Sequence, residues 1–221
     1  MLMPAPRTRQ AQTMADMLRR LGGISPERIR LHPYPACVED VIEIERRENR
    51  LFELVDGALV EKVMGHPESR IATALILALG KYLEHNNIGT LTGEGGMFEL
   101  PANLVRIPDV AFARWERFSE EDLEEAIPEV VPDLAVEVLS KGNTSDEMAR
   151  KLREYFKAGV KLVWFVDPKS KSVTVYHSVT RSNTIPSSGT LDGGKVLPGF
   201  KLPVAKLFAR SNRKRPGRSS N

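Results

Sequence analysis

Two acidic residues lie inside segments that otherwise predict buried strands. Asp109 follows a proline in IPDVAFA, and Glu137 lies in the middle of LAVEVLS. A buried carboxylate without a partner costs several kcal/mol, so other groups must offset both charges. Carboxylate oxygens on neighbouring strands suit Mg²⁺, which binds one or two carboxylates and keeps several waters. The same residues also fit structural acids with buried partners, and the residues alone leave both interpretations open.

A lysine could complete such a site. Residues 144–158 predict a helix that begins shortly after the strand at 134–140, and Glu147, Lys151 and Tyr155 fall on one face of it. If that face packs toward the strand end, the Lys151 ammonium can orient or activate a water at the metal. If it does not, Glu147 and Lys151 form an ordinary surface ion pair.

A third acidic residue is expected from a hairpin. Residues 50–63 form two strand-like runs around Asp56-Gly57, a dipeptide that tolerates the positive φ angles of a tight turn. The register of such a hairpin places Glu61 on its apolar side and Glu53 on the opposite side. An acid on a core-facing side is unusual, so Glu61 is the preferred candidate and Glu53 the second choice.

These residues would be positioned by a mixture of helices and strands, which predicts the α/β (α+β) class. Helices are predicted at 13–22, 38–49, 67–86 and 144–158, and strands at 97–100, 104–113, 134–140, 160–166 and 173–177. The apolar run at 160–166 indicates a strand that is buried on both faces. Residues 1–49 are predicted to be a helical extension, residues 50–208 the main domain, and residues 209–221 a disordered tail.

The composition excludes several classes of protein. The chain has 221 residues, of which 41% are hydrophobic and 28% charged, as in a soluble globular protein. Its longest apolar run, 74–79 within the largely apolar segment 72–79, is far shorter than the roughly 20 residues that cross a bilayer. We therefore expect no membrane partner and, since no signal peptide is visible, a cytoplasmic location. The single Cys37 excludes cysteine-based zinc sites.

Charge is distributed unevenly along the chain. The formal net charge is +3, but the tail 209–221 has five basic and no acidic residues, whereas residues 31–208 carry a net charge of −6. A basic tail can contact phosphates, yet many such tails are solvated and bind nothing. The basic pI of the whole chain is therefore weak evidence for nucleic-acid binding.

The chain resembles the Uma2 family, of the PD-(D/E)XK endonuclease-like superfamily, in five segments that occur in order within residues 50–177. They are FELVDGALVE (52–61), RIPDVAFA (106–113), DLAVEVLS (133–140), the helix that carries Lys151 and Tyr155, and AGVKLVWFVDP (158–168). The resemblance implies a restriction endonuclease-like mixed β-sheet flanked by helices. It also implies metal-dependent hydrolysis of DNA phosphodiester bonds.

The resemblance also implies roles for individual residues. The PD motif falls on Asp109 and the (D/E) position on Glu137, but Leu139 stands where the strict motif has its lysine. Uma2-like sequences carry this lysine on the following helix, which implies Lys151. Asp109, Glu137 and the Leu139 backbone carbonyl would then bind Mg²⁺ (or Mn²⁺). Glu61 would be a further ligand or orient the water that Lys151 positions or deprotonates.

Two functions remain open. The first is a metal-dependent DNA endonuclease, which the complete set of Asp109, Glu137 and Lys151 favours. The second is a catalytically inactive nucleic-acid-binding or assembly protein with a nuclease-like fold, which the acidic main domain favours. In both cases the expected partners are DNA and, by resemblance to related nucleases, a second copy of the chain.

Overall fold

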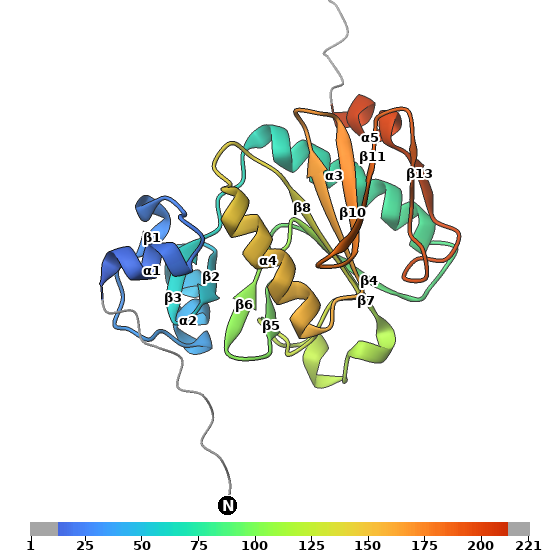
Figure 1. The fold of residues 1–221 in the computed structure, drawn as a ribbon. Coiled ribbons are helices and arrows are strands. Elements are labelled where there is room, and N and C mark those ends of the chain that lie inside the picture. The colour runs from blue at the N-terminus through green and yellow to red at the C-terminus, as the bar shows by residue number, and fades with distance from the viewer. Residues whose placement is uncertain (1–12, 212–221) are drawn as a thin grey trace, which may run out of the picture.

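The computed structural model describes residues 13–211, which fold around a six-stranded central sheet (Figure 1). Its strands are β4 (Gly89–Thr92), β7 (Val110–Arg114), β8 (Leu134–Val138), β9 (Leu162–Asp167), β10 (Ser172–Ser178) and β11 (Arg181–Ile185). The spatial order is β11-β10-β9-β8-β7-β4. Only β8 and β9 run parallel, and the helix α4 (Ser145–Ala158) makes the crossover that such a pair requires.

A second sheet lies beside the first and has the order β1-β3-β2-β6-β5. Its strands are β1 (Ile29–Arg30), β2 (Phe52–Val55), β3 (Ala58–Glu61), β5 (Phe98–Leu100) and β6 (Leu104–Arg106). The remaining elements are α1 (Met14–Arg20), α2 (Val38–Glu48), α3 (His66–Leu83), α5 (Val204–Ser211), the small β12 (Thr190–Asp192) and β13 (Lys201–Pro203) pair, and 3-10 turns at Pro26–Arg28, Trp115–Arg117 and Glu121–Leu123. No helix within residues 13–211 is long and apolar enough to cross a membrane.

The central sheet is covered on both faces, and alternate residues of each strand point to opposite sides. Val136 and Trp164 pack on the side of α3 and α5, whereas Ala135 and Phe165 pack on the side of α4. Figure 1 shows α4 in front of the sheet and α3 crossing behind it. Because Glu137 alternates with Val136, its side chain points toward α4.

Local sequence explains the two elements that matter most for the site. In the hairpin, Asp56 and Gly57 adopt φ angles of 50° and 75°, as the turn requires. In α4, the Thr144 side chain accepts a hydrogen bond from the Glu147 N–H, and Gly159 ends the helix in the left-handed conformation. The hairpin and this helix lie where the sequence predicts them.

The α+β class is confirmed, but the prediction of one strand over 104–113 is wrong. The chain breaks at Ile107-Pro108-Asp109, so β6 joins the second sheet and β7 joins the central one. Proline has no N–H to donate to a ladder, which favours this break. The sequence patterns also missed β1, β4, β11, β12, β13 and α5. The strand β11 is almost entirely exposed and therefore lacks hydrophobic alternation.

The N-terminal segment packs on the rest of the chain. The strand β1 pairs with β3, and the Thr144 hydroxyl donates a 2.6 Å hydrogen bond to the Gly22 carbonyl. A Cβ at Gly22 would lie 2.6 Å from the Glu147 backbone nitrogen. The proposed division at residue 49 stays a prediction. Residues 1–12 and most of the basic tail, residues 212–221, lie outside the described residues.

The close approach at Gly22 predicts an asymmetric effect of two neighbouring substitutions. Gly22 and Gly23 both have positive φ angles, but an added Cβ would clash with α4 at Gly22 and would meet nothing within 4 Å at Gly23. Gly23→Ala should cost about 1 kcal/mol of unfolding free energy from backbone strain, and Gly22→Ala about 1–3 kcal/mol more from the clash. Urea denaturation of both variants measures this difference. Equal losses would contradict the docking of this segment on α4.

Candidate active site

Asp109 and Glu137 lie side by side on neighbouring strands. The Asp109 N–H donates to the Val136 carbonyl at 3.0 Å, which continues the β7–β8 ladder by one residue. Its Oδ2 accepts a 2.6 Å hydrogen bond from the Val138 N–H. Both acids are buried, with 3% and 4% of their surfaces exposed. The strand break after β6 therefore places Asp109 next to Glu137.

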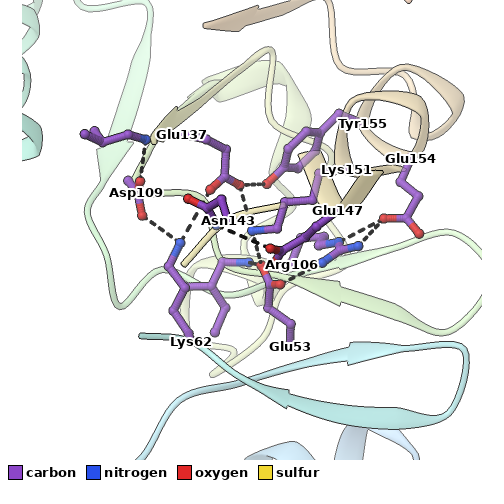
Figure 2. A network of polar contacts seen from close by, with 12 residues as sticks. Glu53, Lys62, Arg106, Asp109, Glu137, Asn143, Glu147, Lys151, Glu154 and Tyr155 are labelled. Atoms are coloured by element: carbon purple, nitrogen blue, oxygen red, sulfur yellow. Dashed lines mark hydrogen bonds and ion pairs between the residues drawn. The ribbon is translucent and has the colours of Figure 1, made fainter. Parts of the chain in front are cut away.

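The helix α4 brings Lys151 and Tyr155 onto Glu137. The Lys151 Nζ lies 3.2 Å from Glu137 Oε1, and the Tyr155 hydroxyl donates to the same oxygen at 2.5 Å. Figure 2 shows these side chains converging on the carboxylate from the helix. Glu147 on the same face is also buried, where it pairs with Arg28 at 2.8 Å. The face of α4 predicted from the i, i+4, i+8 spacing is therefore the buried one, and the surface-pair alternative is wrong.

The acid from the hairpin is Glu53 rather than Glu61. The predicted register holds, since Phe52 pairs with Glu61 and Glu53 with Val60. However, Glu53 Oε1 lies 3.1 Å from Lys151 Nζ, whereas Glu61 pairs with Arg50 at 2.6 Å near the surface. The expectation that Glu61 shares the site is thus not met by its placement.

Glu53 rather than Glu61 reaches Lys151 because both faces of the hairpin are covered. Phe52 and Leu54 pack against residues of α2, while Val60 packs in the cluster that includes α4. The apolar side of the hairpin is consequently not the side that faces the central sheet. A sequence pattern identifies sides of a strand, but not which neighbour covers each side.

Sequence reasoning missed Arg106, which anchors Glu53. Its Nη1 donates to Glu53 Oε2 at 2.6 Å, and its Nε donates to Glu154 Oε2 at 3.0 Å. The Ile107 N–H donates to the other oxygen of Glu53 at 3.3 Å. An arginine between Val105 and Ile107, in an apolar strand, was the available signal, because a buried guanidinium needs acidic partners.

Sequence reasoning also missed Lys62, which follows β3. Its Nζ lies 2.6 Å from Asp109 Oδ1 and 3.6 Å from Glu137 Oε2, and its side chain is only 8% exposed. In Figure 2 the lysine approaches the two carboxylates from the side of the hairpin. The sequence offered little signal here, because a lysine directly after a hairpin strand is usually solvated.

The charges of this cluster balance. Three buried carboxylates, those of Glu53, Asp109 and Glu137, face three cations, which are Lys62, Arg106 and Lys151. Glu154, which also contacts Arg106, has a cation of its own in Arg150 at 2.7 Å. Burial alone would raise the pKa of Glu137, but Lys151 and Lys62 hold the pKa of this carboxyl below its usual value. Burial is opposed in the same way at Glu53, where Lys151 and Arg106 lower the pKa.

Asp109 and Lys62 respond differently to burial. Burial raises the pKa of Asp109, although Lys62 acts in the opposite direction. Burial would lower the pKa of Lys62, but Glu137 and Asp109 outweigh it and raise that pKa. Lys62 therefore stays protonated at neutral pH, and Asp109 is the acid of the cluster that is most easily neutralised.

A small cavity of about 20 Å³, open to solvent, adjoins the two carboxylates. It is lined by Arg28, Lys62, Val63, Met64, Glu68, Asp109, Glu137, Val138, Ser140, Asn143 and Lys151. Leu139 is not part of this lining, and its N–H donates to the Val166 carbonyl at 2.8 Å. The predicted role of the Leu139 carbonyl as a ligand is not tested by these contacts.

The donor set fits a hard divalent cation of the kind that keeps bound waters. Within residues 13–211 no group of three or more His, Cys, Asp or Glu side chains is arranged to hold a metal. Two carboxylates suffice for Mg²⁺, however, and Asp109 and Glu137 border an open cavity that admits water. The Lys62 ammonium contacts Asp109 and approaches Glu137, so these carboxylates are close enough to face one cation.

The family model of Uma2, described as a "putative restriction endonuclease", matches residues 32–205 of the chain. The chain belongs to the Uma2 family. A solved structure described as a "putative nuclease belonging to DUF820", from Anabaena variabilis, is similar to this Uma2 protein in fold. The TM-score is 0.70 at 18% identity, over 80% of this chain and 99% of the other. A search of the curated proteins found no match.

The placement of the two hairpin acids predicts unequal effects on stability. Glu53→Gln leaves Arg106 and Lys151 buried with a weakened partner, so it should lower the unfolding free energy by about 3 kcal/mol. Glu61→Gln removes a partly exposed pair with Arg50 and should cost less than about 1 kcal/mol. Chemical denaturation of both variants checks this order. A larger loss for Glu61→Gln would show that the hairpin faces are assigned wrongly.

Proposed function

We propose that this Uma2 protein is an endonuclease that uses a divalent metal ion to hydrolyse DNA phosphodiester bonds. The observation that carries the proposal is the convergence of Asp109, Glu137 and Lys151 at one solvent-open cavity. These residues come from three separate segments, so a purely local cause does not explain their meeting. Membership of a nuclease family supports the same reaction class.

Asp109 and Glu137 would hold the metal ion, Mg²⁺ or Mn²⁺. Each presents one oxygen toward the same side, where Lys62 now lies. A metal bound there would stabilise the negative charge that develops on the phosphate and acidify a bound water. Glu137 is fixed for this task by Tyr155 and Lys151, which hold its other oxygen.

Lys151 would position the attacking water as an ammonium, or accept its proton as a neutral amine. Its Nζ is held between Glu137 and Glu53 at 3.2 and 3.1 Å, which fixes its direction at the cavity wall. Glu53 is therefore proposed as a positioning residue in place of Glu61. Arg106 in turn fixes Glu53, so that a chain of ion pairs leads from the second sheet to the cavity.

The alternative is a catalytically inactive nucleic-acid-binding or assembly protein. One observation favours it: the three acids of the cluster are already neutralised by three cations, as in a purely structural network. In that case the family fold would serve binding alone. The two functions differ in whether substitution at the cavity abolishes a reaction.

Plasmid nicking with Mg²⁺ or Mn²⁺ tests the proposal. Asp109→Asn, Glu137→Gln and Lys151→Met should each lower the nicking rate by about 100-fold or more, because each removes a group that acts in the transition state. Glu61→Gln is the control and should retain the wild-type rate. Folding of each variant is checked by circular dichroism.

Two results would contradict the endonuclease. One is the absence of metal-dependent nicking by the folded wild type on supercoiled, linear and single-stranded DNA. The other is nicking that survives both Asp109→Asn and Glu137→Gln, which would indicate a contaminant or another site. DNA retention without nicking in a gel-shift assay would favour the alternative.

We also propose that the active form is a cytoplasmic homodimer. The resemblance to related nucleases supports a dimer, and two-fold symmetric dimers are the commonest homo-oligomers. Light scattering in the presence and absence of DNA measures the mass. A monomer under both conditions would remove this part of the proposal without affecting the chemistry of the site.

A further inference from the structure

Lys62 lies where a metal ion would be needed. In each of the two carboxylates one oxygen already has partners within the protein. Asp109 Oδ2 accepts a hydrogen bond from the Val138 N–H, and Glu137 Oε1 is bound by Lys151 and Tyr155 of α4. The second oxygen of each faces Lys62, at 2.6 Å from Asp109 Oδ1 and 3.6 Å from Glu137 Oε2. These are the same two oxygens that would bind a metal.

We propose that Lys62 is a positioning residue whose ammonium holds the place of the divalent cation in the metal-free protein, and that metal binding displaces it into the adjoining cavity. The inference rests on the proposed metal-dependent function and adds a step to it. Metal loading is then an exchange of one cation for another. The metal-free protein keeps its buried acids neutralised until the exchange occurs.

Electrostatics makes the exchange necessary. An ammonium and a divalent ion cannot share two oxygens, because like charges a few ångströms apart repel strongly where little water screens them. Without any cation, Asp109 and Glu137 would repel each other inside the protein unless one of them took up a proton. Either cation removes this repulsion while both acids stay charged.

Only Lys62 of the two neighbouring lysines can move without breaking the cluster. Lys151 is held by both Glu53 and Glu137 beneath α4. Both lysines line the cavity, but the Lys62 side chain is more exposed, at 8% against 3% for Lys151, and its backbone N–H is fixed to the Leu51 carbonyl at 2.9 Å. Its four-carbon side chain can swing while β3 stays in place.

The cavity also offers the displaced ammonium a new environment. Glu68, from the first turn of α3, lines it together with Lys62. An anionic substrate entering the cavity would meet the same ammonium. The Lys62 ammonium would thus move from the acids of the metal site to the solvent side of the cavity, where its positive charge would stabilise a bound phosphate group.

Calorimetry with Mn²⁺ tests the exchange through affinity, independently of activity. Lys62→Met removes the competing cation and should raise the affinity for Mn²⁺ about tenfold or more, which is at least about 1.4 kcal/mol. Lys201→Met is the matched control, since it removes a lysine that pairs with Asp192 at 3.7 Å on the surface. Adding Asp109→Asn to Lys62→Met should abolish the gain.

The outcomes separate this inference from the proposed function. Wild-type binding with an unchanged or weaker affinity in Lys62→Met overturns the exchange and leaves the metal-dependent function standing. No binding by the wild type or by Lys62→Met, with both folded, overturns both. Tighter binding in Lys62→Met but not in Lys201→Met supports the exchange.

A second measurement uses the wild type alone, in case Lys62→Met does not fold. Acetylation of lysines by an N-hydroxysuccinimide ester, read by mass spectrometry, reports how accessible each amine is. Lys62 should be protected without metal and labelled several-fold faster with saturating Mn²⁺, while Lys201 is labelled equally in both. Equal protection of Lys62 with the metal bound would overturn the exchange.

Discussion

A carboxylate in the middle of a buried strand is stable only when cations and hydrogen-bond donors surround it. Glu137 is such a carboxylate, and three parts of the chain meet around it. The central sheet supplies Glu137 itself, α4 supplies Lys151 and Tyr155, and the segment after the hairpin supplies Lys62. The side chains between the two sheets are therefore arranged so that the charge of the Glu137 carboxylate is offset by cations and hydrogen-bond donors.

The topology explains why these elements meet there. Because β8 and β9 are parallel, the chain must cross over the sheet between them, and α4 makes that crossing directly over Glu137. Strands β2 and β3 of the second sheet pack against the same buried face of α4, so that Glu53 reaches Lys151. The cluster is therefore a consequence of how two sheets share one helix, and it borders an open cavity.

Much of the site could be predicted from the sequence because its signals are local. An acid in an apolar strand marks Glu137, and an i, i+4, i+8 spacing marks the buried face of α4 that carries Lys151. The hairpin register was also correct, because turn chemistry fixes it. Whether Asp109, Glu137 and Lys151 perform catalysis stays a proposal.

The rest depended on contacts between distant segments, which local patterns do not contain. Choosing Glu53 over Glu61 requires knowing that α2 covers one side of the hairpin and α4 the other. Lys62 looks like a surface lysine until Asp109 is placed opposite it. The strand break at Pro108 was readable in principle, yet the partner sheets on either side of it were not.

The central claim is that Asp109 and Glu137 form the metal-binding pair of this Uma2 protein. Anomalous diffraction from crystals grown with Mn²⁺ tests it most directly, because the signal locates the ion without reference to activity. The account predicts one Mn²⁺ bound by Asp109 and Glu137, with the Lys62 ammonium moved away from both. Crystals soaked in millimolar Mn²⁺ that show no ion there, and Lys62 still against Asp109, would contradict it.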